Sequence, residues 1–246
     1  PAIITTDRSG TAGDANGATF LWKEEGGSNY GYDIGGAISG FEPIQMNDVT
    51  YGYKHPDALT LSNGNSIVVY ERFTVLSTTT RTITVARRDR ESGAITTANI
   101  LTVGVFNNAL YPCICELPNG DLLIAYWVAK NTDECQLGVL RSTDKGANWT
   151  EITSAALTSS ISTKGSSPFG FTPKRLRMCA NEEHVLIVAE LLYNDSSAGT
   201  ADRMGQFASS NMGASFSTVG ITGGSGASAA FSRYRADCLV DKNGFF

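Results

Sequence analysis

The strongest constraint on the fold is a turn that recurs through the chain, with short apolar segments on both sides of it. Its asparagines are Asn63, Asn119, Asn181 and Asn243, which are spaced 56, 62 and 62 residues apart. Asn-Gly and similar pairs join antiparallel strands because both residues tolerate the positive φ of a tight turn. The flanking segments are rich in Val, Ile, Tyr and Thr, and no apolar stripe of helical period persists. The sequence therefore predicts an all-β protein made of hairpins.

A third strand and a glycine-bearing turn follow each of the first three hairpins. The predicted third strands are residues 82–88, 136–141 and 203–208. The turn glycines are Gly93, Gly146 and Gly213, which come 30, 27 and 32 residues after the asparagines. A fourth strand after each glycine completes a repeat of four antiparallel strands, which is typical of a β-propeller blade. We therefore predict a β-propeller of four-stranded antiparallel blades.

The repeat also predicts the domain organisation. The blades are expected at residues 48–104, 105–165 and 166–228, with a partial fourth blade at 229–246. Residues 1–47 do not fit the repeat, contain one strand-like segment at residues 18–23, and are predicted to form an N-terminal arm that anchors the protein or closes the ring. The fourth repeat stops within its second strand, which would leave a bare sheet edge. We therefore expect this sequence to be the N-terminal part of a longer gene product.

Composition narrows the classes of function. A net charge of −5 argues against a nucleic-acid partner, which needs a basic patch to contact phosphates. No apolar run approaches the roughly 20 residues that span a bilayer, so no membrane span is expected. Sparse, irregular cysteines predict buried free thiols, and neither a disulfide framework, a metal site nor a cofactor is expected. These cysteines are Cys113, Cys115, Cys135, Cys179 and Cys238.

One motif stands out from the repeat. Residues 142–149 match Ser-x-Asp-x-Gly-x-x-Trp at every fixed position, which chance gives about once in a thousand chains of this length. The Asp carboxylate can accept backbone N–H groups of the turn, the Gly supplies a positive φ and the Trp buries its ring. Residues 209–216 repeat the device, and residues 89–93 are a degenerate third copy. The structural residues are expected to be Ser142, Asp144, Gly146, Trp149, Ser209, Asn211, Gly213 and Phe216.

These motifs resemble the Asp box, or BNR repeat, of the sialidase (neuraminidase) superfamily, in which the box joins the third and fourth strands of a blade. The resemblance covers about residues 48–246 and implies a sialidase-like propeller. The box is a structural turn at the outer rim of a blade, so it implies a fold and not catalysis. Other glycosidases, sorting receptors and viral attachment proteins also carry it.

The resemblance implies where a sialidase would hold its substrate. Members bind a carboxylate with three arginines, the first of them in a Tyr-Arg-Ile-Pro-like segment that opens the first blade. Residues 53–56 read Tyr-Lys-His-Pro, so Lys54 stands at the arginine's place, and an ammonium does not reproduce the bidentate guanidinium. The acid/base Asp is expected within residues 73–84, which contain Arg81 but no carboxylate. The Tyr nucleophile and last arginine would fall in later blades, so exo-sialidase chemistry is not expected.

A candidate binding set lies at the starts of the predicted inner strands, which face the central channel of a propeller. The functional interpretation is a cleft for anionic or hydroxyl-rich glycans, with Tyr53, Tyr111 and Tyr234 as stacking surfaces. The candidate ligand-binding residues are Lys54, His55, Asp57, Tyr111, Arg175, Arg177, Arg233 and Arg235.

The structural interpretation of the same residues is that the arginines form salt bridges with Asp57, Asp237 and Glu71. Two function hypotheses remain, beside a purely structural one in which the propeller is a spacer in a larger particle. The first is a propeller that recognises a glycan or cell-surface polysaccharide, or docks onto other subunits of an assembly, without hydrolysis. Its setting would be extracellular or a virion surface, as in a phage tail fibre or an adhesin. The alternative is an exo-acting sialidase-type glycoside hydrolase, which needs an acid carboxylate and a nucleophile around one sugar and whose site later blades would complete.

Overall fold

The computed structural model describes the secondary structure of most of the chain between residues 51 and 222, together with short segments near the N-terminus. The described residues are 2–5, 19–22, 31–32, 51–74, 77–100, 108–129, 134–154, 157, 161–162, 169–195, 199–222 and 238. Every strand and sheet named below lies within these residues. No helix among them is long and apolar enough to cross a membrane.

Three successive groups of four strands form antiparallel meanders, and we call them blades 1, 2 and 3. Blade 1 contains β4 (Tyr51–Thr60), β5 (Ser66–Thr74), β6 (Ser77–Arg88) and β7 (Ile95–Asn99). Blade 2 contains β8 (Asn108–Glu116), β9 (Leu122–Ala129), β10 (Glu134–Ser142) and β11 (Thr150–Ile152). Blade 3 contains β13 (Phe169–Ala180), β14 (Val185–Asp195), β15 (Gly199–Ser209) and β16 (Ser217–Thr222).

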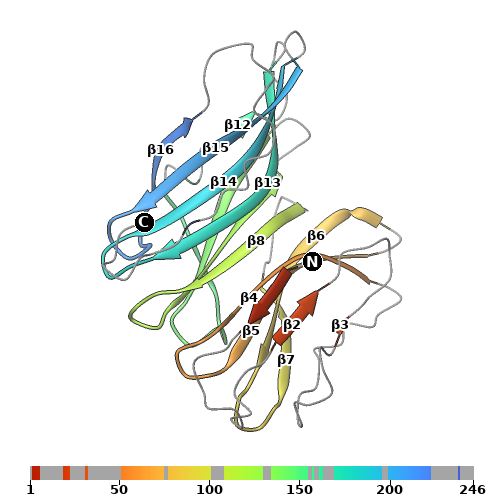
Figure 1. The fold of residues 1–246 in the computed structure, drawn as a ribbon, viewed down its shortest axis with the longest axis vertical. Coiled ribbons are helices and arrows are strands. Elements are labelled where there is room, and N and C mark those ends of the chain that lie inside the picture. The colour runs from red at the N-terminus through yellow and green to blue at the C-terminus, as the bar shows by residue number, and fades with distance from the viewer. Residues whose placement is uncertain are drawn as a thin grey trace.

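The first strands of the blades lie next to one another, β4 beside β8 and β8 beside β13 (Figure 1). This arrangement makes them the inner strands of a propeller, so the predicted fold class is confirmed. Blades 1 and 2 are also linked by one parallel pair, Arg81 with Asn108, and β12 (Ile161–Ser162) pairs with β10. The predicted fourth blade lies outside the described residues apart from Cys238.

The N-terminal residues form a small separate sheet. Strands β1 (Ala2–Thr5), β2 (Thr19–Trp22) and β3 (Gly31–Tyr32) pair antiparallel in the order β1-β2-β3, and β1 lies next to β4 (Figure 1). The sequence indicated one strand-like segment here, at residues 18–23, and it corresponds to β2. Whether this part of the chain is an anchoring arm or closes a ring stays a prediction.

The core fills the two interfaces between blades. Strand β9 is buried on both faces because successive side chains of a strand point in opposite directions. Its Leu122, Ile124 and Tyr126 pack towards blade 1, whereas Leu123 and Trp127 pack towards blade 3. Free cysteines occupy the interface between blades 2 and 3, and the buried ones are Cys113, Cys115 and Cys135.

The Asp-box residues of blade 2 close the turn between β10 and β11. Asp144 Oδ1 accepts hydrogen bonds from the backbone N of Asn148 and from Ser142 Oγ, both at 2.8 Å. Ser142 Oγ in turn accepts the backbone N of Gly146 at 2.8 Å. Trp149 is partly buried, donates Nε1 to the Gly146 carbonyl at 3.1 Å and packs against the cluster between blades 1 and 2.

Blade 3 repeats this turn with an amide in place of the carboxylate. Asn211 Oδ1 accepts the backbone N of Ser215 at 2.9 Å, and Ser209 Oγ accepts that of Gly213 at 2.8 Å. Phe216 takes the place of the Trp and is buried between blades 2 and 3. The hydrogen bonding therefore depends on the side-chain oxygen and not on its charge.

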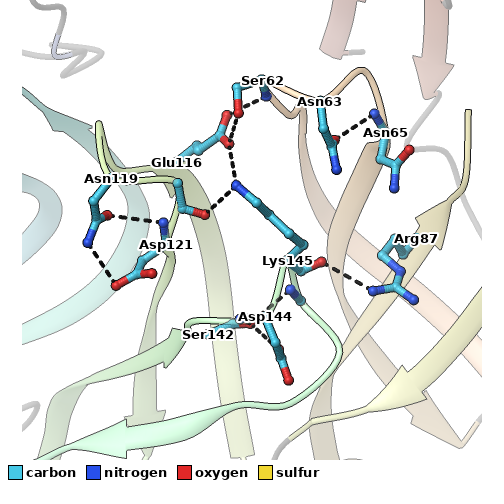
Figure 2. A network of polar contacts seen from close by, with 12 residues as sticks. Ser62, Asn63, Asn65, Arg87, Glu116, Asn119, Asp121, Ser142, Asp144 and Lys145 are labelled. Carbon is cyan, nitrogen blue, oxygen red and sulfur yellow. Dashed lines mark hydrogen bonds and ion pairs between the residues drawn. The ribbon is translucent and has the colours of Figure 1, made fainter.

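Each of these two Asp boxes also packs against the preceding blade, through a glycine and a backbone carbonyl, and we call this pair of contacts a clamp. A Cβ on Gly146 would lie 2.8 Å from Ile67 Cδ1 in blade 1. Arg87, which is paired with Ile67 in the sheet, donates Nη1 to the Lys145 carbonyl at 3.3 Å (Figure 2). The second clamp has the same geometry: a Cβ on Gly213 would lie 2.6 Å from Leu123 Cδ1 in blade 2, and Arg141 donates to the Met212 carbonyl at 3.3 Å.

Candidate functional site

The inner strand of every blade is interrupted by a β-bulge in its first half. The register shifts fall between Lys54 and Asp57, between Leu110 and Cys113, and between Pro173 and Leu176. A bulge bends its strand and re-aims a side chain, and bulges are over-represented next to active sites. The three bulges lie towards one end of the blades, which we call the bulge end, and the Asp boxes lie at the opposite end, the box end.

Two bulge residues adopt a backbone conformation that is unfavourable for side chains other than glycine. His55 has a φ of 49° and Tyr111 a φ of 53°, and each precedes a proline. Such left-handed residues cost about 1–3 kcal/mol each and persist only where surrounding contacts hold them. The two strained positions occupy equivalent places in blades 1 and 2.

Those contacts converge on Glu71 of β5, whose side chain is 0% exposed. Its Oε1 accepts the backbone N of Tyr111 at 2.6 Å and lies 2.6 Å from His55 Nδ1. Its Oε2 accepts Arg81 Nη1 at 3.0 Å. Because a carboxylate is an acceptor, His55 Nδ1 is the donor in its hydrogen bond. We call Glu71, His55, Arg81 and Tyr111 the Glu71 cluster.

The Glu71 cluster joins two blades through their aromatic side chains. The rings of His55 and Tyr111 have centroids 4.1 Å apart and planes tilted by 42°. The His55 side chain is 25% exposed and that of Arg81 is 23% exposed, so both reach the surface above the buried carboxylate. The result is a partly exposed pair of rings with a cation beside it.

Asp57 follows the first bulge and connects all three inner strands. Its Oδ2 accepts the backbone N of Ile114 in β8 at 3.0 Å. Burial raises the pKa of the Asp57 carboxyl, and this hydrogen bond together with the attraction of Arg177 and Arg175 in β13 opposes that rise. This electrostatic attraction is what the structural interpretation predicts, in which the inner-strand arginines pair with Asp57. Arg175 nevertheless remains exposed.

The structure therefore brings together part of the predicted binding set. His55 and Tyr111 are in ring contact, and Asp57 lies within electrostatic reach of Arg175 and Arg177. Lys54 lies in β4 opposite Glu71 in register, with its side chain outside the described residues. The predicted residues that lie wholly outside the described part of the chain are Arg233, Arg235, Tyr234 and Asp237.

Sequence reasoning missed the role of Glu71. It had treated this carboxylate as a salt-bridge partner of the inner-strand arginines, whereas the structure pairs it with His55 and with Arg81 of the same blade. The sequence contained a signal for this role in the alternation of β5. Ile67, Val69 and Glu71 lie on one face of the strand, and the side chains of Ile67 and Val69 are fully buried. A carboxylate on a buried face needs specific partners, which marks such a residue as a candidate.

The chemistry of the bulge end is that of a polar and aromatic binding surface. Rings, an exposed arginine and backbone polar groups can stack against a sugar and hydrogen-bond its hydroxyl or anionic groups. Two carboxylates at this end, Glu71 and Asp57, accept hydrogen bonds from protein groups, and a third, the partly buried Glu190 of β14, lies opposite the bulge of blade 3. Among the described residues, no three His, Cys, Asp or Glu side chains are grouped as metal ligands.

No protein-family model matches this sequence, and no curated protein matches it. Among solved structures, a polysaccharide lyase of family PL25, an ulvan lyase, has a TM-score of 0.54 at 12% identity, covering 89% of this chain and 55% of that one. An α-L-arabinanase from Penicillium chrysogenum with bound arabinobiose has a TM-score of 0.51 at 14% identity, covering 65% and 46%.

A microbial sialidase also matches, with a TM-score of 0.49 at 11% identity over 87% of this chain and 42% of that one, which is too distant to carry an argument. The chain thus spans about half the length of the solved structures that it matches. At these identities the likeness shows a shared fold, that of carbohydrate-active propellers. Membership of the sialidase superfamily stays a prediction.

Proposed function

We propose that this protein recognises carbohydrate at the bulge end of its blades and does not hydrolyse it. The observation that carries the proposal is the Glu71 cluster, in which two strained bulge residues from different blades present a pair of rings beside a cation. Strain of this kind clusters at ligand sites, because the surrounding structure must maintain it. The bulge of blade 3 adds the exposed Arg175 to the same end.

Two of the carboxylates at the bulge end, Glu71 and Asp57, are engaged by protein groups, which supports recognition without hydrolysis. Most glycosidases place two carboxyl groups on either side of the scissile bond, and both must reach the sugar. Glu71 is fully buried and accepts three hydrogen bonds, and Asp57 is partly buried with one oxygen bound to the backbone of blade 2. In these positions they support neighbouring groups rather than a substrate.

The ligand class we propose is an anionic or hydroxyl-rich glycan of a cell-surface polysaccharide. The cations of the bulge end favour acidic sugars, and one structural neighbour is an ulvan lyase bound to a glucuronate–sulfated rhamnose fragment. We place the protein outside the cell or on a virion surface, as an adhesin or tail component that also contacts other subunits. The support for that setting is the polar, lysine-poor texture of the sequence.

The proposal is tested by titrating the full chain with three probes: an ulvan-derived glucuronate–sulfated rhamnose oligosaccharide, arabinobiose and sialyllactose. We expect calorimetric binding of at least one probe and unchanged oligosaccharide by chromatography after long incubation. Tyr111→Ala should abolish this binding, because it removes one of the two rings. Release of shortened products, or the absence of any binding, would refute the proposed function.

A second candidate, an exo-acting sialidase-type hydrolase, is favoured by one observation. The raised pKa of Asp57 is a property of general acids, which must hold a proton near neutral pH. This candidate predicts that a fluorogenic sialoside is turned over and that Asp57→Asn stops the turnover. Binding without turnover would leave recognition as the function.

A further inference from the structure

We propose that Glu71 is a positioning residue for carbohydrate binding. Its carboxylate fixes the His55 ring of blade 1 against the Tyr111 ring of blade 2, so that the two blades offer one rigid contact surface. This inference rests on the proposed function, because it assigns a role within the same site. It adds that the binding surface depends on the Glu71 carboxylate, a buried group that does not touch the ligand.

A comparison of the two interfaces shows what is special about Glu71. Trp127 of β9 occupies the equivalent position in blade 2, four residues beyond Leu123 as Glu71 is beyond Ile67. Trp127 is also fully buried and also anchors the bulge of the next blade, by donating Nε1 to the Lys174 carbonyl at 3.1 Å. A neutral side chain is therefore enough to anchor a bulge.

The carboxylate of Glu71 is therefore expected to do more than anchor the bulge of blade 2. Burying a charge is unfavourable unless it is paired, and an apolar replacement is often neutral or stabilising for the fold alone. Glu71 has two charge-bearing or polar side-chain partners, His55 Nδ1 at 2.6 Å and Arg81 Nη1 at 3.0 Å. Its charge thus orients two partly exposed groups, the His55 ring that contacts Tyr111 and the Arg81 guanidinium, which Trp127 does not do for blade 3.

The same interface contains a second carboxylate that serves as a matched control. Glu116 of β8 lies at the box end and accepts Ser62 Oγ and the backbone N of Ser62 in blade 1, both at 2.7 Å (Figure 2). It also lies 3.5 Å from Lys145 Nζ. Glu116 therefore joins blades 1 and 2 as Glu71 does, but away from the proposed binding surface.

The experiment compares Glu71→Gln with Glu116→Gln in the full chain. Three quantities are measured: affinity for the ulvan-derived oligosaccharide, the exchange rate of the Tyr111 amide hydrogen, and the thermal unfolding midpoint. We expect Glu71→Gln to weaken binding about ten- to hundredfold, which is the worth of a charge-assisted hydrogen bond, and to speed Tyr111 exchange. We expect Glu116→Gln to lower the unfolding midpoint while leaving affinity and Tyr111 exchange unchanged.

Two results would overturn the inference: wild-type affinity in Glu71→Gln, or an equal loss of affinity in Glu116→Gln, which would indicate a general loosening of the interface. If Glu71→Gln does not fold, the double variant E71Q/R81M removes both charges together, and its affinity and Tyr111 exchange are compared with those of Arg81→Met alone, so that only the further change is attributed to Glu71. If the wild-type chain binds no probe, the proposed function fails. Tyr111 exchange then decides alone whether Glu71 positions the bulge: faster exchange in Glu71→Gln supports it, and unchanged exchange refutes it.

Discussion

At the scale of single residues, two aspartates show how the surroundings of a carboxyl group set its pKa. Asp144 is exposed in the box turn, where hydrogen bonds from the backbone and side chain of Asn148 and from Ser142 lower its pKa to about 2. Asp57 sits at the inner strands, where burial raises its pKa despite the bond from Ile114 and the nearby arginines. Hydrogen bonding dominates the first case and desolvation the second.

The lowered pKa of Asp144 predicts an acid-dependent contribution to stability. Its carboxylate stabilises the fold above its ordinary pKa of 3.8, and this contribution is lost as pH falls from there to about 2. Asp144→Asn should keep the turn, because Asn211 makes the equivalent bonds in blade 3, and should remove this pH dependence. Urea unfolding between about pH 5 and about pH 2 measures the slope. Equal slopes in the variant and the wild type would contradict the prediction.

The raised pKa of Asp57 predicts a pH dependence of stability opposite to that of Asp144. The folded state holds this proton more tightly than the unfolded state, so the contribution to stability is present at low pH and is lost as pH rises through the folded pKa. Asp57→Asn removes the buried charge and keeps an oxygen for the Ile114 N–H. The variant should therefore gain stability relative to wild type on going from about pH 4 to about pH 7 in urea unfolding. A relative loss over that range would show that the arginines outweigh desolvation.

At the scale of strands and turns, the sequence allowed the hairpins to be predicted but not the bulges. The apolar segment before the Asn63 turn, residues 58–62, overlaps only the end of β4, because β4 begins at Tyr51 and ends at Thr60. Pro56 and a left-handed His55 interrupt the alternation there, and residue type alone does not identify which residue other than glycine adopts a positive φ. The Glu71–Tyr111 bond spans 40 residues, so it becomes visible only once the blades are packed.

The box glycines allow a matched test of the clamp between blades. Gly93 has a φ of +70° with nothing within 4 Å of a Cβ, so Gly93→Ala should cost about 1–2 kcal/mol from backbone strain alone. Gly146 has a φ of +85° and would place its Cβ 2.8 Å from the buried Ile67 side chain. Gly146→Ala should therefore cost about 1–3 kcal/mol more, through overpacking. Denaturant unfolding of both variants decides this, and equal losses would show that Ile67 yields freely.

At the scale of the whole molecule, the two ends of the blades make different kinds of contact. The box end joins neighbouring blades through repeated arginine–carbonyl and glycine–aliphatic contacts, and the bulge end gathers rings and cations from successive inner strands. Because each described blade contacts mainly its neighbours along the chain, stability should resemble a sum of blades and interfaces, as in other repeat proteins. The repeat spacing sufficed to predict the four-stranded antiparallel blades, whereas the contacts at each end of the blades became visible only in the packed structure.

This additive stability predicts that removing one arginine–carbonyl contact between blades destabilises one blade and not all three. Arg141 joins blade 2 to blade 3 through the Met212 carbonyl at 3.3 Å, and Arg87 joins blade 1 to blade 2 through the Lys145 carbonyl at the same distance. Arg141→Gln should raise amide hydrogen exchange in β13–β16 and leave β4–β7 at the wild-type rate, because local opening follows the weakened interface. Arg87→Gln should raise exchange in β4–β7 and leave β13–β16 unchanged. Arg141 also binds Asp121 within blade 2, at 2.6 Å from Nη2, so Asp121→Asn serves as the control that spares the Met212 contact. A uniform rise across the three blades in either arginine variant would show that they unfold as one cooperative unit.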